Sequence, residues 1–187
     1  MKVYIIHQKA KNHRDRFIQD IIKQYDEVEI IEPIKVHNSI QYGGRRTNEV
    51  YRRNELSLTL TNILLLKRIV SEKMDNVLIL EDDAIMINEI PNIDYKPYNY
   101  YYLHSSRINA TDSNIYDCHA MLYPTWQKTN ELLDIILSME KYLAWDNLLN
   151  HIRKKYHLYA DQSNIMVFKQ ASGKSSIITS YYNNRYN

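Results

Sequence analysis

The feature that most limits the fold of this chain is a short run of wholly apolar residues, Val77-Leu78-Ile79-Leu80. A strand with one face in water alternates apolar and polar side chains, whereas a strand covered on both faces does not alternate. The run is too short for a typical helix and contains β-branched residues, which favour a strand. We therefore predict a strand in the interior of a sheet that has helices on both faces.

Similar apolar runs alternate with segments of helical spacing along the rest of the chain. Further strands are expected at 3–6, 28–31, 100–103, 120–123 and near 165–168. Amphipathic helices are expected at 17–25, from about 54 onward, at 125–137 and at 145–154. In the second of these helices, Leu64 is one of the expected core residues. Alternating strands and helices predict an α/β sandwich with a mainly parallel central sheet, in a single domain over 1–187.

Composition excludes several functional classes. The single cysteine, Cys118, cannot form an intrachain disulfide or a four-cysteine zinc site. The 24 basic and 22 acidic residues leave a net charge of +2, without the strong field of a dedicated nucleic-acid binder. The apolar start is too short for a signal peptide, and no apolar run reaches the roughly 20 residues of a membrane helix. We expect a soluble, cytoplasmic protein with no nucleic-acid partner and no integral membrane segment.

Three acidic residues, Glu81-Asp82-Asp83, directly follow the apolar run. Ligands of parallel sheets bind at the carboxyl ends of the strands, and adjacent carboxylates repel one another unless a cation or protons neutralise them. Carboxylate oxygens suit Mg²⁺ or Mn²⁺, which also bind diphosphates. Alternation along an extended backbone places Glu81 and Asp83 on one side, as metal ligands, and leaves Asp82 for a ribose or sugar hydroxyl. An exposed acidic turn is the alternative, and these three residues alone do not decide between the two.

Several segments follow one another in the order found in a known enzyme family. They are 54–62 and 78–84, the strand 3–6 with Arg14 and Arg16 behind it, His119-Ala120-Met121-Leu122-Tyr123 with the helix at 125–137, Trp145-Asp146-Asn147-Leu148-Leu149, and Gln170 with Ser175-Ser176-Ile177. Together they resemble glycosyltransferase family 25, which includes bacterial lipooligosaccharide galactosyltransferases and procollagen galactosyltransferases. The resemblance covers nearly the whole chain, and the order of the segments is more specific than any one of them.

The resemblance implies a GT-A type, Rossmann-like fold and a metal-dependent, inverting glycosyltransferase. Such an enzyme moves galactose or glucose from a UDP-sugar to a hydroxyl of a glycan, lipid-linked or protein acceptor, as in lipopolysaccharide biosynthesis. It implies Mn²⁺ or Mg²⁺ on Glu81 and Asp83. The residues that we assign to donor binding are His7, Arg14, Arg16, Asn62 and Asp82. Asp146 is the candidate general base, and its alternative role is that of an N-cap or surface residue of the helix that it begins.

The sequence departs from the family pattern at several positions. Asn54 and Ser57 replace two glycines, Thr61-Asn62 replaces a Ser-His pair, and Ser176 replaces an aspartate. These changes keep a second function open, a non-catalytic protein of the same fold that binds a sugar nucleotide or acts as a scaffold. A metal-dependent phosphoester hydrolase is less consistent with the chain, since the nucleophile and carboxylate-x-Lys motifs of such enzymes are absent.

Two further groups of residues each have two interpretations. One of the four histidines His104, His119, His151 and His157 completes the metal shell, or all four are structural. The basic residues Arg45, Arg46, Arg52 and Arg53 hold a diphosphate or an acidic acceptor, or they form a solvated face.

Overall fold

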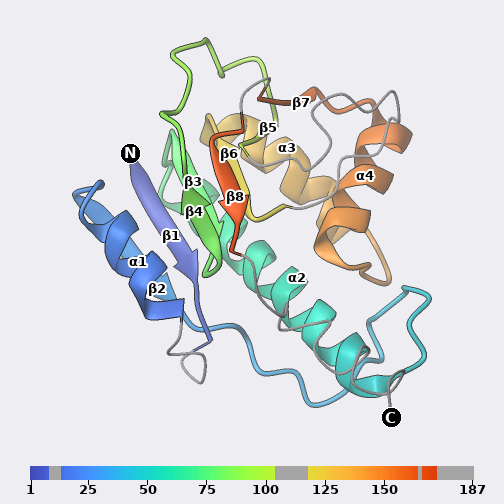
Figure 1. Cartoon of the computed structure of the whole chain (residues 1–187). Helices are drawn as coiled ribbons and strands as arrows, with labels where there is room; N and C mark the ends of the chain where they lie inside the picture. The colour runs from blue at the N-terminus through green and yellow to red at the C-terminus, as the bar shows by residue number, and fades with distance from the viewer. Residues whose placement is uncertain (9–13, 104–117, 164–165, 172–187) are drawn as a thin grey trace.

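The computed structural model describes residues 1–8, 14–103, 118–163 and 166–171 (Figure 1). In chain order the elements are β1 (Lys2–Ile6), α1 (Asp15–Ile22), β2 (Glu27–Ile31), α2 (Glu49–Ser71), β3 (Val77–Glu81), β4 (Ala84–Met86), β5 (Tyr100–Tyr102), β6 (Ala120–Tyr123), α3 (Trp126–Leu137), α4 (Trp145–Tyr156), β7 (Ala160–Gln162) and β8 (Phe168–Gln170). No helix in these ranges is both long enough and apolar enough to cross a membrane.

The central sheet has six strands in the order β2-β1-β3-β6-β5-β7. The strands β2, β1 and β3 are parallel, and β7 is parallel to β5. The strand β6 runs antiparallel to both of its neighbours, β3 and β5. A second, small antiparallel sheet pairs β4 with β8. The prediction of an α/β fold with a mainly parallel sheet is confirmed.

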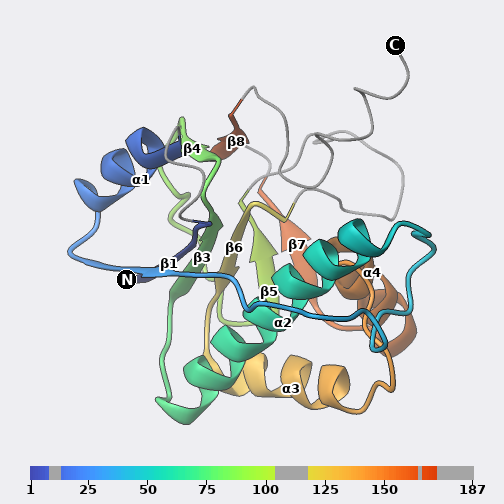
Figure 2. The same ribbon diagram turned by 90° about the horizontal axis from the view of Figure 1, so that it is seen from below.

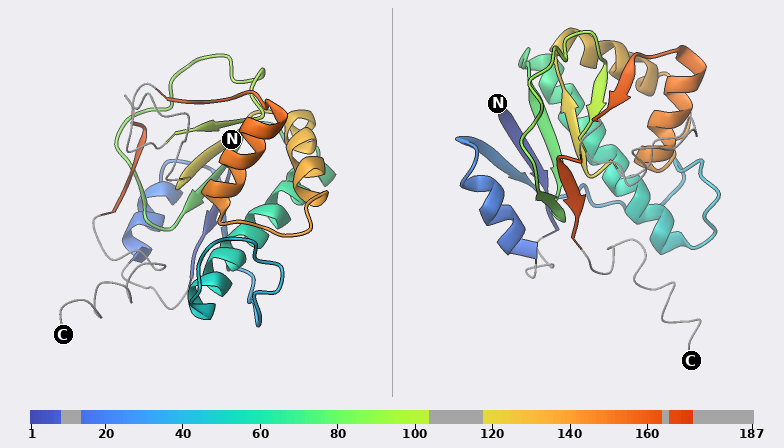
Figure 3. Two further views of the ribbon diagram at one scale, coloured as in Figure 1. Left: turned by 90° about the vertical axis from the view of Figure 1, so that its right-hand side faces the viewer. Right: turned by 45° about the horizontal axis from the view of Figure 1, so that its top comes forward.

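The sheet is the middle of three layers. Helices α2, α3 and α4 cover one face, where side chains such as Tyr4 and Ile79 pack among them. Helix α1 and the β4–β8 pair cover the other face, where Val3 and Leu78 are buried. Figures 2 and 3 show α1 and the helical group on opposite sides of the sheet. Because β3 is buried on both faces, its sequence does not alternate.

The structure differs from the sequence prediction mainly in α2. This helix begins at Glu49, several residues earlier than expected, because the side chain of Asn48 caps it by accepting from the amides of Val50 and Tyr51. The expected core position of Leu64 is wrong, because this side chain is 50% exposed while Leu65 and Leu66 are buried. The strands β4 and β7 are only three residues long and carry no extended apolar pattern.

Candidate functional site

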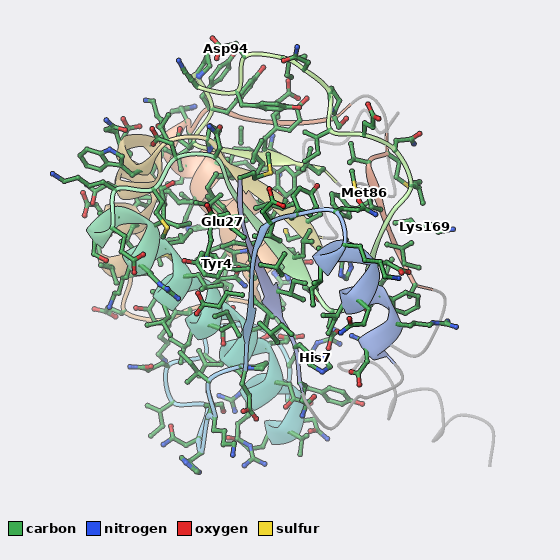
Figure 4. All side chains as sticks on the ribbon, turned by 90° about the vertical axis from the view of Figure 1, so that its left-hand side faces the viewer. Tyr4, His7, Glu27, Met86, Asp94 and Lys169 are labelled. Carbon is green, nitrogen blue, oxygen red and sulfur yellow. The ribbon has the colours of Figure 1, made fainter. Side chains whose placement is uncertain are left out.

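The acidic residues lie where the central parallel strands end. The register of β1 and β3 pairs Ile6 with Glu81, so the residues that follow the two strands, His7 and Asp82, lie side by side. Figure 4 shows His7 at the end of β1 beside α1. This edge is where ligands of open α/β sheets bind.

Asp82 is buried and held by the first loop of the chain. Its carboxylate lies 3.0 Å from His7 Nδ1, accepts from the amide of Gln8 at 3.4 Å and pairs with the Arg14 guanidinium. The other ring nitrogen of His7 lies 3.3 Å from an Asp15 oxygen. Asp82 therefore fixes the position of Arg14, the residue that directly precedes α1, and with it the start of that helix.

Asp83 connects the end of β3 with β8. Its carboxylate lies 3.3 Å from Arg14 Nη2 and accepts from Gln170 Nε2 at 3.2 Å, and its carbonyl accepts from the Ala171 amide at 2.8 Å. Burial raises the pKa of Asp83, but the contacts with His119, Arg14 and Gln170 outweigh burial and lower it overall. The side chain, 3% exposed, is therefore a carboxylate at neutral pH.

His119 completes a compact group with two of the carboxylates. Its Nδ1 lies 3.2 Å from Glu81 Oε2 and 3.3 Å from Asp83 Oδ1. Antiparallel pairing places it there, since the Glu81 amide donates to the His119 carbonyl at 2.9 Å at the start of β6. Burial lowers the pKa of His119, but the opposite effect of Glu81 and Asp83 is larger and raises the pKa to about 11.

Glu81, Asp83 and His119 form a group that can hold a metal ion. One ligand atom from each residue lies within 4.8 Å of the others. Two carboxylate oxygens suit Mg²⁺ or Mn²⁺, and an imidazole nitrogen is a ligand typical of transition metals. The mixed set therefore fits Mn²⁺ better than Mg²⁺. Metal binding needs Nδ1 without its proton, so a cation would replace the proton that the two carboxylates now stabilise.

A pocket of about 150 Å³ opens beside this group. Its lining includes Glu81 and Asp82 from the end of β3, Arg14 from the start of α1, Glu32 and Lys35 from the loop after β2, and Asn54 and Leu58 from α2. Ile34 is one of the residues that attach this loop to α2. Its amide donates to Thr61 Oγ1 at 2.9 Å, and its carbonyl accepts from Ser57 Oγ at 2.6 Å.

The other predicted site residues lie elsewhere. Arg16 is exposed on α1, with its guanidinium 4.6 Å from the centre of the Phe17 ring. Asn62 is buried in α2 and donates to the Leu58 carbonyl at 3.0 Å. Asp146 is half-buried in the first turn of α4, where its Oδ1 accepts from the Asn147 amide at 2.8 Å. His104, Ser175, Ser176 and Ile177 lie outside the described residues.

Sequence reasoning did not single out His119 among the four histidines, although the residue directly precedes a predicted strand. The usable signal is positional, because the residue just before an antiparallel strand lies opposite the end of the neighbouring strand. That signal depends on knowing that β6 pairs with β3 in the antiparallel sense. The sequence does not state this pairing.

Comparisons with known proteins find related folds only. No family model and no curated protein matches the chain. A glycosyltransferase involved in glycosylation of the major capsid of PBCV-1 superposes with a TM-score of 0.51 and 11% identity, over 88% of this chain and 82% of that one. The apo form of glycosyltransferase GlyE from Streptococcus pneumoniae TIGR4 gives 0.50 and 14%, over 87% and 45%. The chain thus has a glycosyltransferase-like, GT-A-like fold.

Proposed function

We propose that this protein is a metal-dependent glycosyltransferase of the family 25 type. It transfers galactose or glucose, with inversion, from a UDP-sugar to a hydroxyl of a glycan, lipid-linked or protein acceptor. The observation that carries the proposal is the group Glu81, Asp83 and His119, which lies at the strand ends of a glycosyltransferase-like fold beside a pocket.

In this proposal Glu81, Asp83 and His119 hold Mn²⁺ or Mg²⁺, and the pocket receives part of the nucleotide. A bound cation supplies positive charge that stabilises the departing diphosphate. Arg14 pairs with Asp82 and Asp83 and lines the pocket, so its guanidinium is well placed for a phosphate oxygen. His7 and Asp82 hold Arg14 in place. Arg16 and Asn62, the other proposed donor residues, reach a donor only if their side chains leave the contacts described above.

Asp146 is the proposed general base. Its carboxylate takes the proton of the acceptor hydroxyl while that oxygen bonds to the anomeric carbon. The bond from this carbon to the diphosphate oxygen breaks on the opposite side, its electrons leave with UDP, and the configuration inverts. Asp146 lies in the first turn of α4, where the helix dipole favours a negatively charged side chain.

Calorimetry tests the donor site. We expect UDP to bind the wild type in the presence of Mn²⁺ and to bind at least tenfold more weakly to Asp83→Asn. Asp20→Asn is a matched control, because Asp20 is an exposed carboxylate of α1 whose ion pair with Lys23 lies on the surface. Thermal melts without metal establish that both variants are folded. UDP binding that is independent of divalent metal and unchanged in Asp83→Asn would contradict the proposed site.

Turnover tests Asp146 separately. We expect Asp146→Asn to consume UDP-galactose or UDP-glucose roughly 10²–10⁴-fold more slowly, with unchanged UDP affinity, because the amide cannot accept the hydroxyl proton. Lys155→Ala, a change at an exposed residue near the end of the same helix, is the control. Wild-type turnover in Asp146→Asn would remove Asp146 from the mechanism.

A non-catalytic sugar-nucleotide binder is the second candidate. It is favoured by Thr61 and Asn62, which stand where the family has a Ser-His pair and which are occupied within α2 and its adjoining loop. This candidate requires metal-dependent UDP binding without consumption of any nucleotide sugar across a donor panel.

A further inference from the structure

A second, larger pocket lies between α2 and the start of α4. Its volume is about 600 Å³, and its walls are the loop 42–46, Glu55 of α2 and the segment 143–147. We refer to it as the glycine pocket, because Gly43 and Gly44 line it and the whole chain has only 3 glycines. The basic cluster found in the sequence contributes Arg45 and Arg46 to the lining.

The glycine pocket is held by contacts between segments that are far apart in the sequence. The Gly43 amide donates to the Tyr142 carbonyl at 2.7 Å, and the Tyr142 amide donates to the Gln41 carbonyl at 2.7 Å. Thr59 Oγ1 donates to the Leu143 carbonyl at 2.9 Å. A side chain on Gly44 would overlap the Tyr42 ring, so glycine allows this close approach.

Of the two arginines that line the glycine pocket, Arg46 is paired with a carboxylate and Arg45 can bind an anionic ligand. Glu55 is 6% exposed, accepts from the Tyr42 hydroxyl and pairs with Arg46 Nε at 3.0 Å. The negative charge of Glu55 is therefore balanced by the positive charge of Arg46. Arg45 is exposed and has no carboxylate partner within the described ranges. The lining thus presents a net positive charge to whatever enters.

The remaining lining suits a sugar ring. Leu143 and Ala144 supply an apolar wall, and Asn147 supplies both a hydrogen-bond donor and an acceptor. Sugars combine apolar C–H faces with hydroxyl groups, and a planar guanidinium binds carboxylate or phosphate through two parallel hydrogen bonds. An anionic saccharide would use all three features.

The glycine pocket lies next to the proposed donor pocket on α2. Asn54 of α2 lines the donor pocket, and the next residue, Glu55, lines the glycine pocket. Asp146, the proposed base, lies in the sequence between the lining residues Ala144 and Asn147. The two pockets therefore flank the same turn of α2, and the second one adjoins the segment that carries the base.

We propose that the glycine pocket binds a saccharide bearing a carboxylate or phosphate group, as part of the acceptor. The assignment to the acceptor rests on the proposed transferase function. Binding of the anionic sugar does not, because it needs neither a nucleotide sugar nor a metal.

Amide chemical shifts in a titration of the whole protein test the binding. The probes are glucuronic acid and glucose 6-phosphate, with glucose as the neutral control. We expect one or both anionic sugars to shift the amides of Gly43, Gly44 and Asn147, and glucose at the same concentration to leave them unchanged. The two anionic probes distinguish a carboxylate ligand from a phosphate ligand. Equal shifts with glucose, or no shifts at these residues with any probe, would overturn the proposal.

Inorganic phosphate and two variants refine the test. Phosphate alone that binds as tightly as both anionic sugars would refute recognition of a saccharide. We expect Arg45→Ala to weaken anionic sugar binding at least fivefold, and Lys23→Ala, which removes an exposed cation of α1, to leave it unchanged. Equal binding by wild type and Arg45→Ala would overturn the role of Arg45.

The acceptor role has its own readout. We expect Arg45→Ala to raise the KM for an anionic acceptor, to leave kcat nearly unchanged, and to leave metal-dependent UDP binding unaffected. Sugar binding in the pocket with no effect of Arg45→Ala on transfer would refute the acceptor assignment and leave the donor site standing. Loss of UDP binding in the wild type would instead refute the proposed function.

Discussion

At the scale of single residues, His119 is the histidine that two carboxylates of the candidate site hold between them. It lies within 3.3 Å of Glu81 and Asp83, and both carboxylates favour its protonated form. In the absence of metal, the protonated imidazole is the cation of this group. Arg14 performs the same task for Asp82 and Asp83.

This arrangement predicts how the stability of the metal-free protein depends on pH. The pKa of His119 rises from 6.5 to about 11 on folding. The contribution of His119 to stability is therefore complete below the unfolded pKa and is lost progressively as pH rises toward the folded value. In urea titrations with chelator, we expect the wild type to lose stability between about pH 7 and pH 9.5.

The variant His119→Gln isolates this effect, because glutamine cannot be protonated. We expect its stability to change less with pH than that of the wild type over the same interval. His151→Gln, a change at an exposed histidine of α4, should follow the wild type. A His119→Gln profile parallel to the wild-type profile would show that His119 does not titrate as described.

At the scale of elements, α2 organises both pockets through two threonines. Thr61 holds the loop after β2 through the Ile34 amide, and Thr59 holds the segment before α4 through the Leu143 carbonyl. The donor pocket and the glycine pocket thus depend on different hydroxyl groups of one helix.

We therefore expect Thr61→Val to weaken UDP binding by about three- to fivefold, since it removes the hydrogen bond that holds the Ile34 amide, which is worth about 1 kcal/mol. The matched change Thr59→Val should leave UDP binding unchanged and weaken binding of anionic sugars. Calorimetry with UDP and Mn²⁺ and the chemical-shift titration measure the two effects. The same loss of UDP affinity in both variants would indicate general destabilisation of α2.

The buried face of α2 gives a second prediction at this scale. Leu66 is fully buried in the core between α2 and the sheet, whereas Leu64 is 50% exposed. We expect Leu66→Ala to lower the free energy of unfolding by about 2–5 kcal/mol and Leu64→Ala by about 0.5 kcal/mol or less. Denaturant unfolding of the two variants measures the difference, and equal losses would contradict the described orientation of the helix.

At the scale of the whole molecule, the donor site joins parts that are distant in the chain. Residues 7 and 14 follow β1, residue 81 ends β3, and residues 82 and 83 follow it. Residue 119 directly precedes β6, and residue 170 ends β8. A ligand that binds this site only in the folded state should therefore stabilise the entire molecule.

We expect UDP with Mn²⁺, at about 100 times its Kd, to stabilise the protein by about 2.7 kcal/mol. For a chain of this size, that corresponds to an increase in Tm of roughly 5–10 °C. Differential scanning calorimetry measures the shift, and Asp83→Asn, which is expected to bind at least tenfold more weakly, should show about half of it or less. A shift of the same size in Asp83→Asn would show that the stabilisation by UDP and Mn²⁺ does not depend on the Asp83 carboxylate.

Much of the fold could be predicted from local patterns. The uniformly apolar β3 indicated burial on both faces, and the alternation of strands and helices indicated an α/β sandwich, because covered strands and amphipathic helices have different hydrophobic periods. The position of Glu81, Asp82 and Asp83 at a strand end followed from the same pattern. The start of α2 was missed because its first turns, with Arg52 and Arg53, are polar on most sides.

The sequence by itself determined that the chain forms covered strands, that acidic residues follow one of them, and which residue types are available for a site. Only the tertiary structure decided which of these residues meet. The reversal of β6 brings His119 to Glu81, the β4–β8 pair brings Gln170 to Asp83, and the packing of α4 against α2 creates the glycine pocket. These contacts join segments that are far apart in the chain, and their formation depends on strand order and direction, which local periodicity does not encode.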